Sequence, residues 1–314
     1  MKAVRDLLEK AKVEYHKGTP IMSDDVYDRL EDTLVADTTV GTTVTGIRYP
    51  HAFPMYSLQK IYEGDKDPAS VYDLPTVVSP KLDGAAVSLQ YIRGVLNLAL
   101  TRGDGKQGLD ITDKMRMLVP DTLSTCKEVV QITGEIVAPL NIENSRNYAS
   151  GALGLKDLKE FKKRQLLFVA YSVEPCIKEL YIEDMAVLDT WGFDTCLTQD
   201  YKDYPKDGTV WRVDSNTKWV DMGHTSHHPR GSFAMKERKE GVVTKLLDVV
   251  WQVGKSGAVS PVAILEPCII GEATVSRATL HNMGIIEDLN LEIGCEVEVI
   301  RAGEIIPQIV GRIN

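Results

Sequence analysis

The sequence predicts an α+β protein of several domains, and three observations support this prediction. A helical pattern occupies the first segment, short β-rich runs separated by turn residues fill the middle, and short strands with one helix close the chain. We therefore expect a small helical domain over 1–45, a larger domain with a mostly antiparallel sheet over 46–238, and a β-barrel of the OB type over 239–314.

The helical prediction for the N-terminal domain rests on the spacing of its apolar residues. Leu7, Leu8 and Ala11 recur at the spacing of one helix face in a Glu- and Lys-rich stretch. Ser23 stands where a helix N-cap is expected, ahead of acidic residues that suit a first helical turn. The Thr-, Gly- and Asp-rich stretch at 36–45 then indicates a linker.

The middle domain and the barrel are predicted element by element. In the middle domain we expect strands at Thr76–Ser79, Ala85–Ile92, Val95–Thr101, Val129–Val137 and Leu166–Val173, and a helix at Ile182–Trp191. In the barrel we expect strands at Leu246–Val253, Ala258–Glu266, Glu296–Arg301 and Gln308–Ile313, with a helical piece around Ala278–Glu287. Four or five short strands with one helix suit a small Greek-key barrel.

Composition narrows the class of protein. The five cysteines are scattered and none forms a C-x-x-C pair, which argues against a disulfide framework and against a paired-cysteine zinc site. The net charge of −9 argues against a basic coat protein for nucleic acid, but it allows an enzyme that meets DNA through local patches. The charged N-terminus is unlike a signal peptide, and no apolar run approaches the length of a membrane span.

The run Lys81-Leu82-Asp83-Gly84 is the first candidate for chemistry. A lysine amine becomes a nucleophile when it loses its proton, which nearby positive charge, burial or a metal ion favours. If the strand continues, Asp83 points to the same face as Lys81. Gly84 would let a nucleotide approach the backbone. The alternative is a surface lysine beside a turn, because this short pattern also occurs by chance.

Further polar residues on separate strands strengthen that candidate. Arg102 heads a glycine-rich turn, Glu135 lies within a predicted strand, and Arg212 and Lys236 end two more strands. One lysine nucleophile, one carboxylate and several cations suit phosphoryl transfer, in which cations and Mg²⁺ stabilise the charge that develops on the phosphate.

These residues resemble the nucleotidyltransferase motifs of the NAD-dependent DNA ligases of bacteria. Residues 81–112 are similar to motif I and its R-G-D-G continuation, 132–139 to motif III, and 166–173 to the aromatic motif IIIa. Residues 207–215 and 223–237 resemble motifs IV and V, and 144–153 resemble a further segment of the family. Much of 248–311 is very close to the family's OB-fold domain, and 15–30 resemble its small helical domain.

The resemblance implies a role for each matching residue. The expected catalytic residues are Lys81, Asp83, Glu135 and Lys236. The expected nucleotide contacts are Ser57, Leu58, Arg102, Glu135, Tyr171, Arg212 and Lys236. The nicotinamide mononucleotide half of NAD is expected at Tyr15, His16, Asp24, Tyr27 and Asp28, and DNA at Arg146, Lys255, Arg277 and Arg301. From the residues alone, Asp24 and Asp28 share one helix face with Tyr27 beside them, and the alternative is a capped helix with a solvated acidic face.

The resemblance also implies an activity. Lys81 would take AMP from NAD, pass it to the 5′-phosphate of a nick in double-stranded DNA, and the 3′-hydroxyl would then close the nick. Mg²⁺ or Mn²⁺ would assist, and no zinc is expected. The setting would be DNA replication and repair in the cytoplasm of a bacterium or of an infected host cell, with a phage as one source.

The sequence departs from the family pattern at several positions. Ser79 stands where the family has Glu, Arg212 and Lys255 stand where Lys and Arg are usual, and Gly154 replaces a common Arg. These changes put single adenine, phosphate and DNA contacts in doubt. Residues 240–245 look like motif IV by themselves, but motif IV must precede Lys236. Since the zinc-finger and helix-hairpin-helix segments of bacterial members are not in this sequence, we expect a minimal ligase, a truncated form, or one subunit of a split enzyme.

Two other functions stay open at this point. The first is an ATP-dependent ligase or RNA-capping-type enzyme of the same superfamily, against which the segment at 15–28 argues. The second is an adenylation subunit or DNA-binding module that needs a second chain to seal nicks, which Ser79, Gly154 and Arg212 favour.

Overall fold

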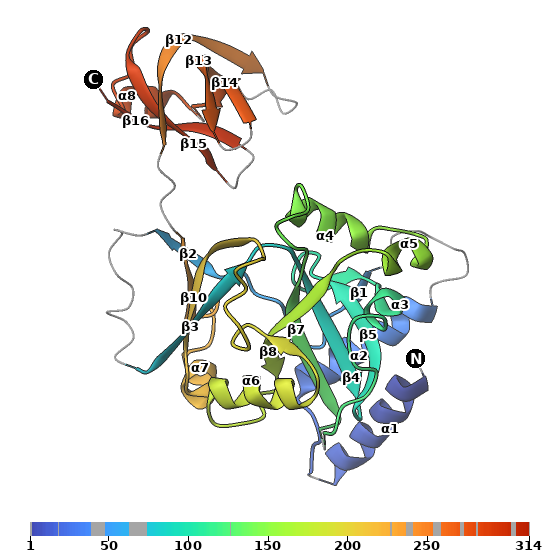
Figure 1. The fold of residues 1–314 in the computed structure, drawn as a ribbon. Coiled ribbons are helices and arrows are strands. Elements are labelled where there is room, and N and C mark those ends of the chain that lie inside the picture. The colour runs from blue at the N-terminus through green and yellow to red at the C-terminus, as the bar shows by residue number, and fades with distance from the viewer. Residues whose placement is uncertain are drawn as a thin grey trace. The chain divides into compact units, whose positions relative to one another are not determined.

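A computed structural model describes residues 2–17, 19–38, 48–62, 74–125, 127–226, 228–236, 241–253, 259–270, 273–280, 282–302 and 306–313. The chain divides into two units, Met1–Glu237 and Arg238–Asn314 (Figure 1). None of the described helices is both long enough and apolar enough to cross a lipid bilayer.

The first unit begins with two helices, α1 (Lys2–His16) and α2 (Asp24–Thr38). Their apolar faces form one cluster with residues from outside the helices; its buried members are Val4, Leu7, Leu8, Val26, Leu30, Ala52, Ile92 and Val129. This confirms both predicted helices. The linker begins later than predicted at 36, because α2 continues to Thr38, and 39–47 lie outside the described residues.

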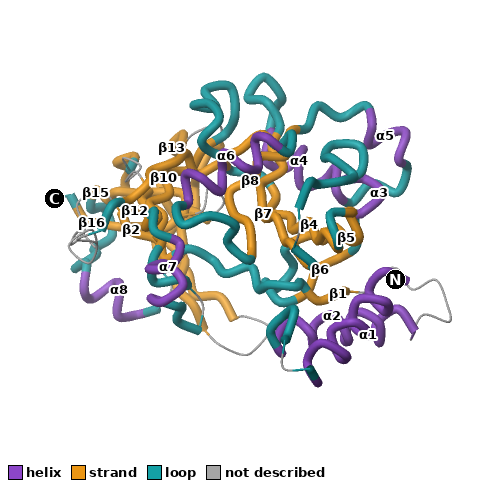
Figure 2. Tube along the Cα trace, turned by 90° about the horizontal axis from the view of Figure 1, so that it is seen from below, coloured by secondary structure: helices purple, strands orange, loops and turns teal. Residues whose placement is uncertain are grey.

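A five-stranded sheet forms the centre of the first unit, in the order β5-β4-β7-β8-β9. Its strands are β4 (Ala85–Ile92), β5 (Val95–Thr101), β7 (Val129–Val137), β8 (Leu167–Glu174) and β9 (Asp194–Thr195). Arg93 and Gly94 join β4 to β5 with φ of 50° and 75°, as a two-residue hairpin with the primed twist requires. The helices α3 (Thr112–Met115), α4 (Ser145–Leu153) and α6 (Tyr181–Thr190) pack against these strands (Figure 2).

A second sheet, of four strands, has the order β2-β11-β10-β3. Its strands are β2 (Gln59–Tyr62), β3 (Thr76–Leu82), β10 (Lys206–Val213) and β11 (Ser232–Lys236). The remaining elements of this unit are the paired strands β1 (Arg48–Pro50) and β6 (Gln107–Leu109), and the helices α5 (Leu158–Lys162) and α7 (Asn216–Met222). Because β3 extends beyond its predicted end at Ser79, Lys81 lies within a strand.

The second unit is a closed barrel of five strands in the order β12-β13-β14-β16-β15. The elements are β12 (Val242–Val253), β13 (Val259–Ile270), β14 (Ala273–Thr279), α8 (Met283–Asp288), β15 (Glu296–Ala302) and β16 (Ile306–Arg312). The α+β class and the barrel are as predicted.

One barrel element was predicted wrongly. The helical piece expected around Ala278–Glu287 starts only at Met283, after the Asn282 side chain caps it by accepting from the Ile285 amide. Ala278 and Thr279, the first two residues of the predicted piece, belong to β14, a strand that the prediction lacked. Ala278 is buried in the barrel core and pairs with Ala263 of β13. Pairing with β13 thus extends the strand into residues that were predicted as helix.

Candidate active site

Three charged side chains from neighbouring strands meet at one carboxylate. Lys81 Nζ, on β3, lies 2.8 Å from Asp207 Oδ1, and Lys236 Nζ, on β11, lies 2.7 Å from Asp207 Oδ2. The fold brings them together because β10, which carries Asp207, is paired antiparallel with β3 on one side and with β11 on the other. Two of the predicted catalytic residues, Lys81 and Lys236, therefore share one partner.

Asp207 is ionised in this arrangement. Burial opposes its ionisation, but the ammonium groups of Lys236 and Lys81 outweigh burial and hold the pKa of this carboxyl below its usual value. The side chains of Lys81, Lys236 and Asp207 are 25%, 19% and 16% exposed. A ligand can thus reach the group, while its electrostatic interactions are only partly screened by water.

Glu135 faces the same region from β7. Its Oε1 accepts a hydrogen bond from the Gly84 amide at 3.2 Å. Burial raises the pKa of Glu135 to about 7, against the opposing effects of Lys81 and of the Gly84 amide. The charge of Lys81 favours the ionised form of Glu135, so the two side chains interact electrostatically.

Gly84 is required by the packing of two strands. A Cβ at this position would lie 2.0 Å from the carbonyl oxygen of Ile136, so no other residue fits while β4 and β7 stay paired. The sequence had suggested close approach of a nucleotide as the reason for this glycine. In the structure, the reason is the close approach of the β7 backbone at Ile136.

Asp83 does not continue the strand as expected, because β3 ends at Leu82. Its amide donates to the Pro205 carbonyl at 2.9 Å, and its carboxylate forms a 3.2 Å ion pair with Arg146 on α4. The Asp83 side chain is 10% exposed and that of Arg146 is 49% exposed. Arg146, which was predicted as a DNA contact, is thereby tied to the residue two places after Lys81.

Arg102 heads a turn that also fixes the predicted nucleotide-binding loop. The Arg102 amide donates to Ala86 at 3.0 Å, and its carbonyl lies 3.0 Å from Nε2 of the buried His51. In the same turn the Gly105 carbonyl accepts from the Met55 amide at 2.8 Å. Ser57 and Leu58 therefore come shortly after Met55, which this turn holds in place. His51 is a supporting residue that sequence reasoning missed.

Tyr171 lies on β8, near Glu135 and Arg102. Burial raises the pKa of its hydroxyl, and both of these charged groups act on it. Its carbonyl accepts from the Tyr181 hydroxyl at 3.0 Å, which fixes the backbone of β8 at this position. The predicted stacking residue is therefore close to two of the other predicted nucleotide contacts.

Arg212 lies elsewhere on β10. Its guanidinium donates to the Asn216 side chain at 2.8 Å and lies 4.0 Å from the ring centre of Tyr181 and 4.7 Å from that of Trp219. It pairs with Val77, four residues before Lys81, which is about 13 Å along the strand. The structure thus places Arg212 away from the Lys81–Asp207 pair, and its contact with a nucleotide stays a prediction.

Two of the five predicted nicotinamide residues, Tyr15 and Tyr27, line a separate pocket of about 240 Å³. It is lined by Ala11, Lys12, Tyr15, Pro20, Ile21, Met22 and Tyr27. Asp28 is exposed on α2, and the side chains of His16 and Asp24 lie outside the described residues. The helices that form the pocket pack on Ile92, at the end of β4 opposite Gly84, which is about 23 Å along the strand. The structure therefore does not bring this pocket to Lys81.

The predicted DNA contacts of the second unit are only partly described. Arg277 is exposed on β14. Arg301, on β15, is partly buried and donates to the Ile270 carbonyl at 3.4 Å. Lys255 lies outside the described residues. The roles of these residues stay predictions.

Asp207 is the most important residue that sequence reasoning missed. In the sequence it lies at the start of the segment 207–215, which resembles motif IV, and it was given no role of its own. The available signal was the Asp207-Gly208 pair, because Gly208 has φ of 137° and an added Cβ would meet the Met235 carbonyl at 2.1 Å. Such a glycine indicates that an adjacent strand passes very close to the carboxylate.

Comparison with known proteins gives a consistent assignment. A family model described as the NAD-dependent DNA ligase adenylation domain matches residues 47–202, and one described as the NAD-dependent DNA ligase OB-fold domain matches 243–314. DNA ligase of Aquifex aeolicus is 32% identical over 94% of this chain and 51% of its own length. That of Marinobacter nauticus is 35% identical over 83% and 46%, and that of Parabacteroides distasonis 33% identical over 99% and 57%.

The chain thus spans about half the length of the curated relatives it matches. The two family models fall in the two units of the fold, and the first of them covers Lys81, Asp83, Arg102, Glu135 and Tyr171. On this evidence the chain belongs to the NAD-dependent DNA ligase family, of which it carries the adenylation and OB-fold domains.

Proposed function

We propose that this chain is the catalytic part of a DNA ligase that takes AMP from NAD onto Lys81 and uses it to seal nicks. The carrying observation is the carboxylate of Asp207 held between the ammonium groups of Lys81 and Lys236. A nucleophilic amine with a second cation beside it suits attack on a phosphate, because the second cation stabilises the charge that builds up on the phosphoryl oxygens.

The proposed reaction has three displacements at phosphorus. First, Lys81 Nζ loses a proton and attacks the α-phosphorus of NAD; an N–P bond forms, the bridging P–O bond breaks, and nicotinamide mononucleotide leaves. Next, an oxygen of the DNA 5′-phosphate attacks the same phosphorus, the N–P bond breaks, and the lysine amine regains a proton. Finally, the DNA 3′-hydroxyl attacks the 5′-phosphorus, loses its proton, and AMP leaves.

The surrounding residues have distinct roles in this proposal. Asp207 orients Lys81 Nζ and keeps Lys236 beside it, so that Lys236 can contact the transferring phosphate. Glu135, anchored on the Gly84 amide, faces the ribose or a cation. Arg102 and Tyr171 would contact the nucleotide, because Tyr171 lies near both Glu135 and Arg102.

One acidic residue fits a magnesium requirement. Mg²⁺ is commonly bound by one or two carboxylates together with substrate phosphates. Glu135 supplies such a carboxylate, whereas both oxygens of Asp207 are engaged by Lys81 and Lys236. Glu135 would therefore hold Mg²⁺ or Mn²⁺ together with the phosphates of NAD, and the ion would neutralise phosphate charge.

The donor is proposed to be NAD because of the pocket at Tyr15 and Tyr27. Aromatic rings attract a cationic nicotinamide ring through their faces. Since the helices that line the pocket pack on Ile92, at the end of β4 far from Gly84 and Lys81, one NAD molecule would touch both the pocket and Lys81 only if α1 and α2 took another position. NAD use therefore includes a movement of these helices.

A nick-sealing assay tests the function and the donor together. A duplex with one nick and a labelled 5′-phosphate is incubated with the chain, Mg²⁺, and either NAD or ATP. We expect the joined strand with NAD and none with ATP. Equal joining with ATP contradicts the choice of donor. If NAD gives AMP on the protein but no joined strand, the chain is an adenylation subunit that needs a second subunit for sealing.

A further inference from the structure

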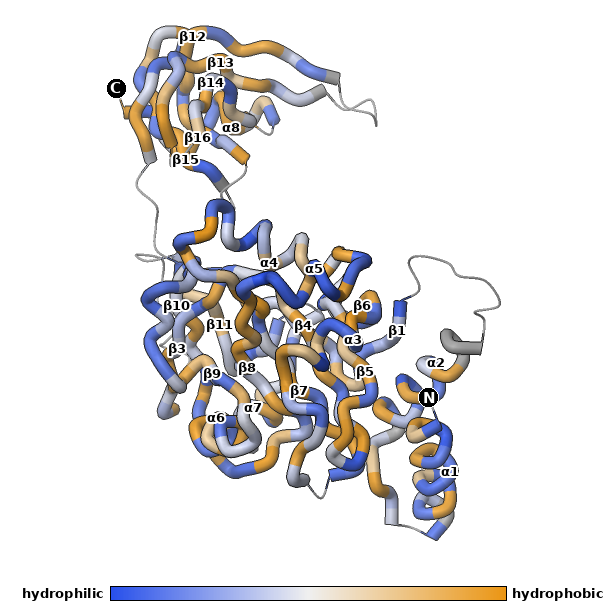
Figure 3. Tube along the Cα trace, turned by 45° about the vertical axis from the view of Figure 1, so that its right-hand side comes forward, coloured by the Kyte–Doolittle hydropathy of each residue, from blue (hydrophilic) through white to orange (hydrophobic). Residues whose placement is uncertain are grey.

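The segment from the start of α4 through the turn after α5 has a charge opposite to that of the whole chain. Residues 145–166 contain six cations and two carboxylates, a net charge of +4, whereas the chain carries −9. The cations are Arg146, Lys156, Lys159, Lys162, Lys163 and Arg164. Figure 3 shows the hydrophilic character of α5 and of the turn after it. A local cationic surface on an acidic protein is a site where a polyanion binds selectively.

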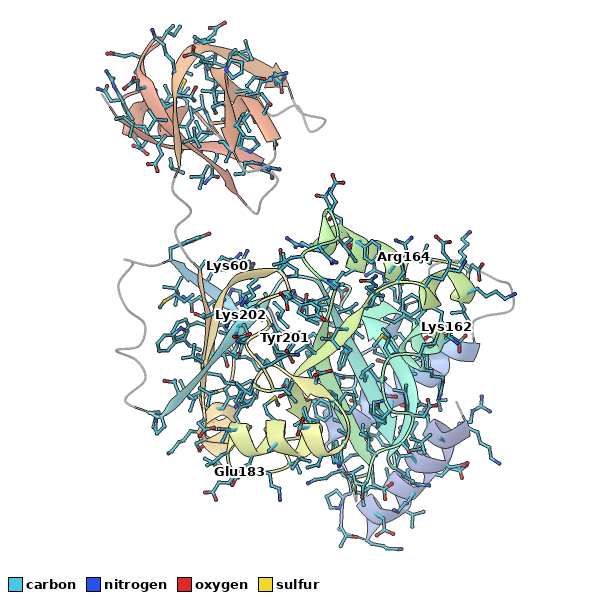
Figure 4. All side chains as sticks on the ribbon, viewed as in Figure 1. Lys60, Lys162, Arg164, Glu183, Tyr201 and Lys202 are labelled. Atoms are coloured by element: carbon cyan, nitrogen blue, oxygen red, sulfur yellow. The ribbon has the colours of Figure 1, made fainter. Side chains whose placement is uncertain are left out.

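The packing of α5 turns its lysines towards solvent. Phe161 is only 1% exposed and holds the helix on the core of the first unit. At 100° per residue, Lys159 and Lys163 fall on the face opposite Phe161, and Lys162 falls beside them. Lys156, Lys159, Lys162 and Lys163 are all exposed, and Lys162 lies at the outer surface of α5 (Figure 4). We call these four residues the lysine patch.

The nearby acidic groups are engaged with other partners. Asp157 caps α5 by accepting from the Lys159 amide at 2.8 Å. Glu160 pairs with Arg164 at 3.3 Å, and Arg164 also lies 4.6 Å from the ring centre of Tyr148 on α4. Among the described residues, no ion pair involves a member of the lysine patch. Its positive charge is therefore not neutralised within this part of the chain.

Helix α4 joins the lysine patch to the candidate active site along the chain. Arg146 lies in the first turn of α4 and pairs with Asp83, two residues after Lys81. The nine residues of α4 span about 13 Å, and Lys156 follows shortly after the helix. On the way, Ser150 and Gly151 are exposed, and nothing lies within 4 Å of a Cβ added at Gly151. A phosphate backbone can thus approach α4 closely.

We infer that the lysine patch binds phosphates of duplex DNA beside the nick, with Arg146 at the end nearest Lys81. This inference rests on the proposed function. A double helix presents about eight phosphate charges in 13 Å of its axis, so Arg146 at one end of α4 and the lysine patch beyond the other end suit a duplex and exceed what one nucleotide fills. Lysine suits such contacts because it is a mobile point charge that carries no base preference.

A pair of charge-matched variants tests the inference. The patch variant is K156Q/K159Q/K162Q/K163Q. The control variant, K2Q/K127Q/K178Q/K218Q, removes four other exposed lysines and changes the net charge equally. Binding is measured against a nicked duplex that lacks the 3′-hydroxyl, over a range of salt concentrations. Each lost phosphate contact lowers the slope of log K against log salt by about 0.9.

We expect the patch variant to bind at least about 10-fold more weakly at low salt and to lose about 2 to 3 units of that slope. The control variant should lose less than about one unit. Transfer of AMP from NAD to the protein should be equal in both variants. An unchanged slope in the patch variant, or an equal loss in the control, overturns the inference. If binding falls as expected but no variant accepts AMP, the patch stands and the proposed function fails.

Discussion

Asp207 Oδ1 lies 2.8 Å from Lys81 Nζ, although the two residues are 126 positions apart. The contact exists because β10 is paired with β3 on one side and with β11 on the other, which places one carboxylate between two lysines. A short peptide around Lys81 could not reproduce it. The reactivity that we assign to Lys81 is therefore a property of the four-stranded sheet, and the first prediction concerns its central carboxylate.

Asp207→Asn should lower the rate of AMP transfer from NAD to the protein by about 100-fold, because the amide keeps the shape but not the charge that orients both lysines. The rate is measured by single-turnover transfer of labelled AMP. Asp203→Asn, an exposed change in the preceding loop, is the control and should stay within about twofold. If the Asp207 variant transfers AMP at a rate within a few-fold of wild type, the proposed role of Asp207 in orienting the two lysines is wrong.

Glu135 should make the stability of the protein depend on pH in a defined direction. Its folded-state pKa of about 7 lies above the ordinary value of 4.5, so the folded state binds the proton more tightly than the unfolded state. Ionisation of this carboxyl therefore lowers the free energy of unfolding as the pH rises from about 4.5 to about 7. Above pH 7 the loss reaches roughly 3 kcal/mol.

Glu135→Gln removes this dependence, because glutamine resembles the protonated acid. The variant should be more stable than wild type at pH 8, and the advantage should shrink towards zero at pH 5. Urea unfolding of both proteins at the two pH values measures the difference. A difference in unfolding free energy that is equal at both pH values contradicts the raised pKa of Glu135.

Two glycines should respond oppositely to alanine. Gly84→Ala places a Cβ 2.0 Å from the Ile136 carbonyl and should destabilise the protein by more than about 3 kcal/mol, since β4 and β7 must separate. Gly151→Ala meets nothing within 4 Å on α4 and should stabilise by about 0.5–1 kcal/mol. Denaturant unfolding of both variants checks the pair, and equal effects would show that the β4–β7 approach is misplaced.

Gly154→Arg should strengthen DNA binding. Gly154 ends α4 with φ of −83° and ψ of −10°, and an added Cβ lies 3.4 Å from the Gly151 carbonyl, so a side chain fits without backbone strain. The arginine would add one cation between Arg146 and the lysine patch. Affinity for the nicked duplex should rise several-fold and the salt slope should steepen by about 0.9. Gly154→Gln is the uncharged control, and an equal gain in both variants contradicts a phosphate contact.

Much of the fold could be predicted from local sequence patterns. Ala85–Ile92 and Val129–Val137 were predicted with the observed bounds, since long β-rich runs end at clear turn residues. β14 was missing from the prediction, and its last two residues, Ala278 and Thr279, were included in the predicted helical piece; the strand forms through pairing with β13. Short-range patterns do not contain that long-range pairing.

The candidate site was predictable in its members more than in its geometry. Lys81 and Lys236 were identified one by one, but their common partner Asp207 depends on strand order, which a linear pattern does not give. Arg212 occupies a motif position, yet the structure surrounds it with Tyr181, Trp219 and Asn216. A motif fixes the residue type, whereas packing decides what the side chain touches.

The most direct test of the account is peptide mass spectrometry of the protein after incubation with NAD and Mg²⁺. The mass of AMP should be added once, on the peptide that contains Lys81. Lys81→Arg, which keeps a positive charge beside Asp207, should take up none. No added mass on the wild type, or equal addition to the Lys81 variant, would contradict the claim that Lys81 carries AMP.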